Sequence, residues 1–381
     1  MNATRKIDLV VTTIFEPSWL DGYLTDLSGF DGRDQVTLRI ICDRKTPASV
    51  WAAAADARAA GFDVVCPTLD EQAAYLTSLA LPEDFIPWNT DNRRNIGFLQ
   101  AWEHGADVVI SIDDDNYCIP GSQFFATHLV VGNVAGQHAA RNAPAGWFNI
   151  CSLLDIEGNP PVFPRGFPYA ARAGVTGNEV DIDAQAVIAF NAGLWLCDPD
   201  VDAVTRLSLH PVAIAASDEA VLLGGDTWSP INTQNTALMR DALPAYYYVR
   251  MGFPIQGMRI DRYGDILSGY FLQKCAKHVG DVARVGSPVA DHIRTPHNLM
   301  QDLYHELAGM VLIEDLVPWL QQLQLSGSSY SDAYESLADA LAHAAAEFRG
   351  FVWDQGGRDF LAETATNMGV WRDALRRIDG S

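Results

Sequence analysis

Basic residues are scarce in this sequence: 26 Lys and Arg stand against 48 Asp and Glu, and the formal net charge is −22. Proteins that bind nucleic acid or an anionic membrane surface do so through clustered Lys and Arg. The composition therefore argues against nucleic acid and membrane as partners. It is still compatible with a small polyanionic ligand, because such a ligand needs only a local pocket with a metal ion and a few Arg.

Several familiar signatures are also missing. The six Cys form no CxxC pair and match no zinc-ligand spacing, there is no GxGxxG or GxxxxGK[ST] motif, and no apolar run reaches the length of a membrane-spanning helix. The first fifteen residues lack the long apolar core and the cleavage site of a secretory signal peptide. We therefore expect a reduced, cytoplasmic protein with neither a dinucleotide-binding fold nor a P-loop.

Hydrophobic residues make up 48% of the 381 positions, enough for a large folded core. Helical segments alternate with apolar, β-branched runs at residues 7–14, 36–42, 62–66 and 107–113. This alternation predicts an α/β fold with a mainly parallel sheet flanked by helices. After residue 300 helical spacing prevails, so we divide the chain into a ligand-binding domain at 1–300 and a C-terminal helical subdomain at 301–381.

Three carboxylates follow directly after the apolar run at 107–112, namely Asp113, Asp114 and Asp115. Adjacent acids raise one another's pKa unless a cation or hydrogen-bond donors share the site. Oxygen ligands of this kind suit Mg²⁺ or Mn²⁺, which in turn bridge phosphate oxygens. Asp43 also follows a predicted strand, and parallel sheets bind ligands beyond the carboxyl ends of their strands. The alternative to a metal site is a solvated acidic turn.

Further along the chain, a loop at 163–174 carries Arg165 and Arg172 among two Pro and two Gly. Guanidinium groups are preferred partners of diphosphate, although two surface arginines would give the same pattern. Asp265 lies where a helix should begin, which is equally typical of a capping carboxylate. His292 is a further candidate ligand, although a lone His is more often structural. The segment 231–240 is polar and predicts a pocket wall.

Five sequence blocks lie in order between about residues 90 and 320, and each is weakly specific alone. They are RNIGF with SIDDD, RGFPYAARAG, GLWLCDPDVDAVTRL, RYGDILSG, and the stretch from DHIR to VLIEDLVPWLQ. The ordered set resembles the plant reversibly glycosylated polypeptides, also called UDP-arabinopyranose mutases, which have a GT-A-like glycosyltransferase fold. The sequence between the blocks differs, which indicates a distant member.

The resemblance implies roles for individual residues. Asp115 would hold the cation with His292 nearby, and Asp113 would contact the ribose or the cation. Asp43 and Arg94 would contact the nucleotide, at the nucleoside and near the diphosphate respectively.

At the sugar, the resemblance implies catalytic roles for Arg165, Arg172 and Asp265. Arg165 falls on the arginine that becomes glycosylated in the family, although an arginine that stays protonated is a poor nucleophile. Gly264 stands where the family often has a second acid. Asp114 has no assigned partner.

The expected activity is therefore a metal-dependent interconversion of pyranose and furanose forms of a nucleoside-diphosphate sugar, with Mn²⁺ or Mg²⁺ and without flavin. The sugar could be arabinose, galactose or fucose, linked to uridine, guanosine or thymidine diphosphate. A glycosyltransferase that moves the sugar to a separate acceptor is the alternative activity, and a non-catalytic sugar-nucleotide binder is a third reading. The C-terminal helices could support a homo-oligomer.

Overall fold

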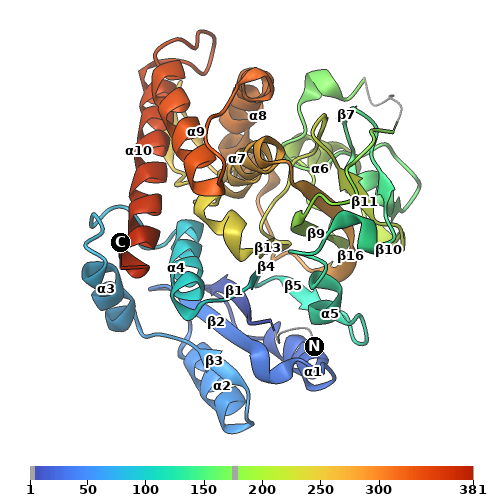
Figure 1. Ribbon diagram of the computed structural model, residues 1–381, viewed down its shortest axis with the longest axis vertical. Helices are drawn as coiled ribbons and strands as arrows, with labels where there is room; N and C mark the ends of the chain where they lie inside the picture. The colour runs from blue at the N-terminus through green and yellow to red at the C-terminus, as the bar shows by residue number, and fades with distance from the viewer. Residues whose placement is uncertain (1–4, 174–178, 381) are drawn as a thin grey trace.

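A computed structural model describes residues 5–173 and 179–380. Its centre is a mixed sheet flanked by helices, which confirms the predicted α/β class (Figure 1). Neighbouring strands follow one another in the order β3 (Asp63–Val65), β2 (Val36–Cys42), β1 (Ile7–Thr13), β4 (Val108–Asp113), β13 (Asn235–Met239), β9 (Ile188–Cys197), β16 (Val282–His292), β11 (Val221–Leu223) and β6 (Arg141–Asn142).

Smaller elements complete the sheet and cover it. The short strands β5 (Asn116–Cys118), β8 (Leu154–Ile156) and β10 (Ala213–Ala216) extend it, and β7 (Gly146–Trp147) pairs with β12 (Thr227–Trp228), and β14 (Phe253–Ile255) with β15 (Met258–Ile260). The helices are α1 (Leu20–Ser28), α2 (Ala48–Ala59), α3 (Leu69–Ser78), α4 (Arg94–His104), α5 (Phe124–His128), α6 (Ala203–Leu209), α7 (Gly264–Val279), α8 (Leu299–Gln322), α9 (Tyr330–Ala344) and α10 (Gln355–Ile378).

The first half of the sheet brings three strand ends together. β1 pairs in parallel with both β2 and β4, so that Thr13 lies opposite Cys42 and Thr12 opposite Asp113. These strands are buried almost throughout, as the continuous apolar runs predict, and α4 packs against β1 and β2. The acid triplet and Asp43 therefore leave the sheet at one edge, as parallel pairing requires.

The pocket wall predicted at 231–240 is wrong, because none of these residues lines the cavity beside Asp113 and the segment instead contains the central strand β13. This strand lies antiparallel between β4 and β9 and is buried at every residue. Because polar side chains interrupt it, β13 has no continuous apolar run from which a buried strand could be predicted. Asn235 donates to the carbonyl oxygens of Leu194 and Pro288 at 3.2 Å, and the Thr236 hydroxyl donates to Asn232 O at 2.7 Å. Buried polar groups with such partners are compatible with a central strand.

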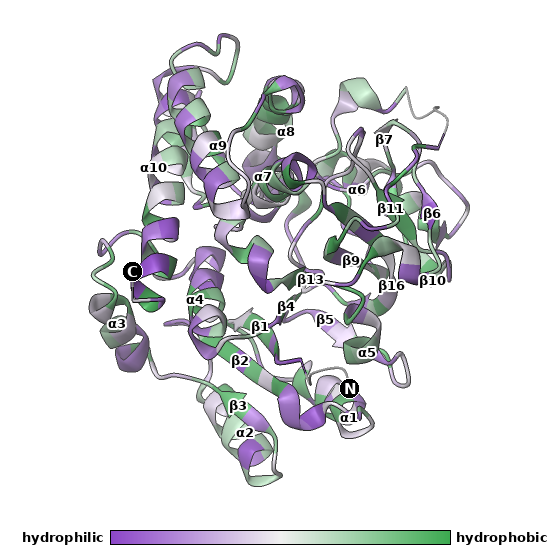
Figure 2. Cartoon of the chain, in the orientation of Figure 1, coloured by the Kyte–Doolittle hydropathy of each residue, from purple (hydrophilic) through white to green (hydrophobic). Residues whose placement is uncertain are grey.

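Of the three C-terminal helices, α9 and α10 pack against each other, whereas α8 packs against α6 and β15 (Figure 1). Pro318 does not break the first of them, since α8 continues from Leu299 to Gln322. The long helix α10 carries alternating hydrophobic and hydrophilic positions (Figure 2), and its Trp371 donates to Leu243 O at 3.1 Å. Apolar side chains of α8, α9 and α10 belong to the same continuous core as the sheet. The division at residue 300 stays a prediction.

None of the helices in the described part of the chain combines the length and apolar character needed to cross a membrane.

At Gly269, helix α7 packs closely on the segment that precedes β13. A Cβ at this position would lie 2.0 Å from Ile231 O. Gly269→Ala should therefore lower the free energy of unfolding by about 1–3 kcal/mol, because backbone must move to make room. The matched control is Gly369→Ala in α10, where a Cβ meets no atom within 4 Å. The free energy of unfolding of this control variant should rise by about 0.4–1 kcal/mol, because alanine restricts the unfolded chain more than glycine does. Urea denaturation measures the free energy of unfolding of both variants. Equal changes in the two variants would contradict the close packing of α7 at Gly269.

Candidate active site

A cavity of about 420 Å³ opens at the edge where β1, β2 and β4 end. Seven residues that the sequence singled out line it: Asp43, Arg94, Asp113, Asp114, Asp115, Arg165 and Asp265. They come from three strand ends, the start of α4, the loop at 163–173 and the first turn of α7. A volume of this size lies in the range of small-ligand pockets.

Each acid of the triplet has a different neighbour. Asp113 Oδ1 accepts from Arg94 Nη2 at 2.5 Å, and Asp114 Oδ2 accepts from the backbone N–H of Ile14 at 3.3 Å. Asp115 Oδ2 lies 3.3 Å from His292 Nε2. The Asp114 carboxyl is desolvated by burial, which raises its pKa to about 6. Burial acts in the same direction on Asp115, but the hydrogen bond and charge of His292 lower the pKa of Asp115 below its usual range.

His292 is not among the cavity-lining residues, but it lies directly behind Asp115. Its Nδ1 contacts the carbonyl oxygen of Asp198, which can only accept, so Nδ1 carries a proton. When Nε2 is also protonated, it donates to Asp115; in the neutral ring, Nε2 instead turns a lone pair toward the Asp115 carboxylate. Two acceptors that face each other fit a shared cation, and a backbone carbonyl behind the imidazole is the usual support of a metal-binding His.

Arg94 is held rigidly at the floor of the cavity. Its Nη1 donates to Ser111 Oγ at 2.9 Å and to Thr233 O at 3.2 Å, and its Nη2 donates to Thr12 Oγ1 at 3.0 Å as well as to Asp113. Burial alone would lower the pKa of Arg94, but the charge of Asp113 outweighs it and raises this pKa. Arg94 therefore keeps its charge beside the acid triplet.

The guanidinium of Arg165 lies between two buried carboxylates. It donates to Asp200 through Nε at 2.9 Å and Nη2 at 3.0 Å, and to Asp265 through Nη1 at 3.1 Å and Nη2 at 2.8 Å. Nη1 also donates to the carbonyl oxygen of Arg262, so all five N–H groups have protein acceptors. Burial would lower the pKa of Arg165, but Asp200 and Asp265 raise it well above its ordinary value.

Gly166 explains how the loop reaches this position. Its φ is +84°, and a Cβ there would lie 2.4 Å from Ile266 Cγ2 of α7. Only glycine allows both the left-handed backbone and the close approach. The neighbouring Arg165 is thereby brought against Asp265 in the first turn of the same helix.

Arg172 lies away from the cavity lining. Its Nη2 donates to Asp202 Oδ2 at 2.6 Å, and its guanidinium stacks 3.6 Å from the ring centre of Tyr169. Asp43 does line the cavity, but both its oxygens accept backbone N–H groups, from Arg44 and Asn89 at 2.6 Å each. The roles predicted for these two residues stay predictions. Gly174, the last residue of the RGFPYAARAG block, lies outside the described residues.

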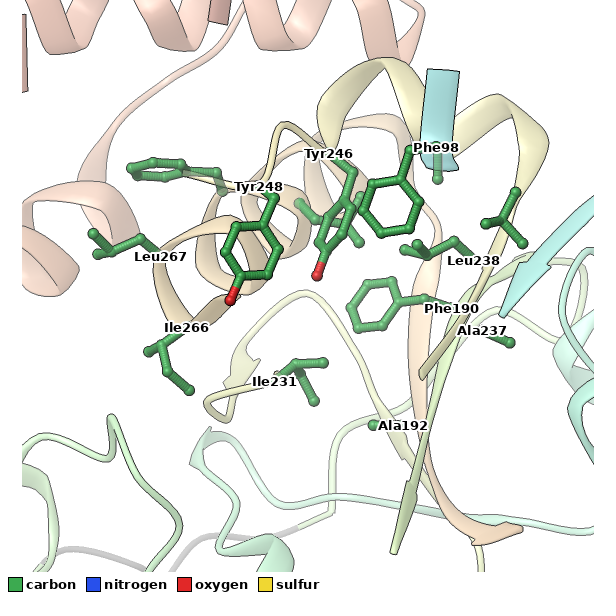
Figure 3. Packing of buried hydrophobic residues seen from close by; sticks show 14 of the residues in the cluster. Phe98, Phe190, Ala192, Ile231, Ala237, Leu238, Tyr246, Tyr248, Ile266 and Leu267 are labelled. Atoms are coloured by element: carbon green, nitrogen blue, oxygen red, sulfur yellow. The ribbon is translucent and has the colours of Figure 1, made fainter. Parts of the chain in front are cut away.

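Sequence reasoning missed several residues of this site. Asp91, Tyr248 and Arg262 line the cavity, and Asp200 binds Arg165 behind it. Asp200 stands inside the GLWLCDPDVDAVTRL block, where the acidic turn was its only signal. Asp91 follows no predicted strand and opens a single helical turn before α4. The Tyr248 hydroxyl donates to Asp91 Oδ2 at 2.8 Å, and Figure 3 shows it beside Tyr246 with both hydroxyls pointing the same way.

Among the described residues, no three or more His, Cys, Asp or Glu side chains are arranged as a complete metal site. Asp113, Asp115 and His292 nevertheless offer two carboxylates and an imidazole at one strand end. Magnesium-type sites in enzymes commonly use one or two protein carboxylates and complete their coordination with substrate phosphates. The donor set therefore fits a cation that is shared with a phosphate ligand.

Comparison with known proteins gives both a family and individual relatives. The sequence model of the family described as reversibly glycosylated polypeptide matches residues 37–371. UDP-arabinopyranose mutase 1 of Arabidopsis thaliana is 28% identical over 221 residues, which cover 57% of this chain and 56% of the relative. UDP-arabinopyranose mutase 1 of Oryza sativa subsp. japonica is 29% identical over 61% of this chain and 59% of the relative. The chain thus spans little more than half the length of the curated relatives it matches.

Among solved structures, glucosyl-3-phosphoglycerate synthase from Mycobacterium tuberculosis in complex with Mn²⁺ and UDP-glucose is similar at 12% sequence identity and a TM-score of 0.39. The match covers 82% of this chain and 80% of that chain.

Proposed function

Because the chain belongs to the reversibly glycosylated polypeptide family, we propose that it interconverts the pyranose and furanose forms of a sugar carried on a nucleoside diphosphate. The proposed enzyme depends on Mn²⁺ or Mg²⁺ and uses no flavin. Relatives named UDP-arabinopyranose mutases support a uridine nucleotide and arabinose, while guanosine or thymidine nucleotides and galactose or fucose are further substrates to test.

The observation that carries the proposal is the composition of the cavity where β1, β2 and β4 end. The acid triplet and Arg94 form one part of its wall, and Arg165, Arg262 and Asp265 form another. A nucleotide sugar combines a diphosphate, which needs cations, with hydroxyl groups, which need carboxylate or amide partners. Both kinds of partner line this cavity.

The divalent cation would be held by Asp113 and Asp115, with His292 as a further ligand. Once bound, it would neutralise the diphosphate as negative charge develops on the leaving oxygen. Arg94 forms an ion pair with Asp113 and thereby fixes the orientation of this proposed ligand. Asp43 and the strand ends beside it would receive the nucleoside.

The proposed reaction breaks the bond between the anomeric carbon and the diphosphate oxygen, exchanges the ring oxygen, and forms the anomeric bond again. Positive charge develops on the sugar, and the carboxyl group of Asp265 stabilises it. We propose an electrostatic role for Arg165 rather than a covalent one. To act as a nucleophile it would have to lose a proton and leave at least one carboxylate partner, and its five donated hydrogen bonds oppose both.

A direct assay tests the proposal. The protein is incubated with UDP-arabinopyranose or GDP-fucose and Mn²⁺ without an acceptor, and the nucleotide sugar is followed by NMR. We expect the furanose form to appear, and Asp265→Asn to remove this activity. Asp339→Asn, an exposed carboxylate on α9, serves as the matched control and should behave as wild type.

An unchanged donor would contradict the mutase proposal. Transfer of the sugar only when an acceptor is added would establish the glycosyltransferase alternative instead. A thermal-shift series with UDP, GDP and dTDP in the presence of Mn²⁺ identifies the nucleobase, because ligand binding to the folded state raises the melting temperature.

A further inference from the structure

The exchange of ring oxygens requires a proton carrier. The hydroxyl that closes the new ring forms a bond to the anomeric carbon and loses its proton. The former ring oxygen leaves that carbon with the bonding electron pair and gains a proton. One proton is released and one is taken up, so a single carboxylate that accepts the first and returns it can serve both steps.

Asp114 has one backbone N–H partner but stands between the two proposed cation ligands, and the other carboxylates of the cavity apart from Asp91 are already paired with other groups. Both oxygens of Asp265 accept from the Arg165 guanidinium, and Asp113 accepts from Arg94. Asp115 faces His292, and both oxygens of Asp43 accept backbone N–H groups. A proton that arrived at one of these oxygens would have to displace a hydrogen bond or ion pair that is already formed. These groups are suited to fixed charge rather than to proton transfer.

Asp91 differs from them. Within the described part of the chain its side chain has one hydrogen-bond partner, the neutral hydroxyl of Tyr248, which contacts Oδ2. The residue is open to the cavity, and its second carboxylate oxygen has no protein partner there. The backbone beneath it is rigid, since Arg93 is buried, stacks 3.5 Å from the ring centre of Trp88 and donates to Gln72 Oε1.

We propose that Asp91 carries the proton between the two sugar oxygens that exchange places in the ring, and that Tyr248 positions it. This inference rests on the proposed mutase function and names a residue for one step of it. The carboxylate of Asp91 takes the proton from the hydroxyl that closes the new ring and delivers it to the former ring oxygen. Asp265, with both oxygens paired to Arg165, stabilises the charge on the sugar.

The electrostatic surroundings of Asp91 agree with this role. The groups that face it are Tyr248 from the segment after β13, Asp261 and Asp265 around the start of α7, and Arg94 from α4. Desolvation by the surrounding protein and the two acids raise the pKa of Asp91 to about 6, while Tyr248 and Arg94 act in the opposite direction. A carboxyl with a pKa near the working pH accepts and returns a proton most effectively.

Positional isotope exchange separates bond cleavage from ring exchange. The substrate carries ¹⁸O in the bridge between the anomeric carbon and the β-phosphorus, and scrambling of the label into the non-bridging β-oxygens reports cleavage and re-formation of the anomeric bond. We expect Asp91→Asn to keep scrambling within a few-fold of wild type while furanose formation falls at least about 100-fold. Binding of the nucleoside diphosphate and the melting temperature, measured alongside, report whether the variant is folded.

The outcomes are distinct. Furanose formation at the wild-type rate in Asp91→Asn, or an equal loss of scrambling and furanose formation with binding intact, would overturn the role of Asp91. A wild-type protein that neither scrambles the label nor forms furanose would refute the mutase function itself, and the inference with it.

Tyr248→Phe tests the positioning role through a pH profile. If Asp91 must be ionised to accept a proton, kcat/KM of the wild type falls as the pH is lowered through about 6. Removing the hydroxyl that stabilises the ionised form raises the pKa of Asp91, so the midpoint of this fall should move to higher pH in Tyr248→Phe. An unchanged midpoint would exclude Asp91 as the titrating group.

Discussion

Replacement of Arg165 by methionine is expected to destabilise the protein by about 3–5 kcal/mol and to remove its activity, because two buried carboxylates lose their shared partner. Asp200 and Asp265 are both buried, and together they accept four of the five N–H groups of Arg165. The charge and hydrogen bonds of Arg165 overcome the effect of burial and hold the pKa of Asp200 well below its usual range. Urea denaturation measures the change in the free energy of unfolding.

Arg172→Met is the matched control for this prediction. Arg172 also pairs with a buried carboxylate, but Asp202 keeps the Tyr169 hydroxyl and the Thr205 N–H and hydroxyl as donors. Its loss should therefore be limited to about 1–2 kcal/mol. A loss in Arg165→Met that is no larger than in Arg172→Met would contradict the central role of Arg165. Adding Asp200→Asn to Arg165→Met should restore part of the stability, because it removes one unpaired charge.

The second large effect is expected at the acid triplet. Asp115→Asn should lower turnover about 10³-fold or more, because cation-assisted stabilisation of a leaving diphosphate contributes several kcal/mol and each 1.4 kcal/mol corresponds to a factor of ten. It should also remove the Mn²⁺-dependent part of the thermal shift produced by the nucleoside diphosphate. Turnover at saturating Mn²⁺ and thermal shifts with and without EDTA measure both effects.

Asp114→Asn is the control for Asp115→Asn, because it removes one negative charge from the same acid triplet without removing a proposed cation ligand. The Asp114 carboxyl accepts from the backbone N–H of Ile14, and an asparagine carbonyl oxygen can accept the same hydrogen bond. We expect its activity to stay within about tenfold of wild type, since a neutral group replaces a carboxyl that no cation role requires. If Asp114→Asn were the more damaging of the two, the metal role of Asp115 would be refuted.

The parts of the fold that the sequence predicted are those with a local signal. β1, β2 and β4 are continuous apolar runs, and parallel pairing then brings Asp43 and the acid triplet to one edge. β13 and β16 were missed for different reasons. The polar side chains of β13 find their partners far along the chain, and β16 is interrupted at Gly286 to Pro288, where its register with β9 shifts.

The same distinction applies to the site. The acids that follow strands could be found from the pattern, and Asp265 could be placed at the start of its helix. Asp200 could not be given a role, because its meaning depends on Arg165, 35 residues earlier. Asp91 could not be predicted from the sequence, because its hydrogen-bond partner, Tyr248, lies 157 positions later in the chain. Long-range partners of this kind leave no periodicity in the sequence.

The saturated guanidinium of Arg165 has a consequence for ligand binding. Its orientation is determined by folding, through hydrogen bonds that exist without any ligand. A ligand therefore meets a charge distribution that is already in place, and binding energy need not be used to order this side chain. The nitrogen atoms have no free N–H to offer, so at this point the cavity wall presents acceptor oxygens of Asp265 rather than donors. The wall thus favours ligands whose hydroxyl groups can donate hydrogen bonds. Arg165 acts on such ligands through its electrostatic field and not through direct hydrogen bonds.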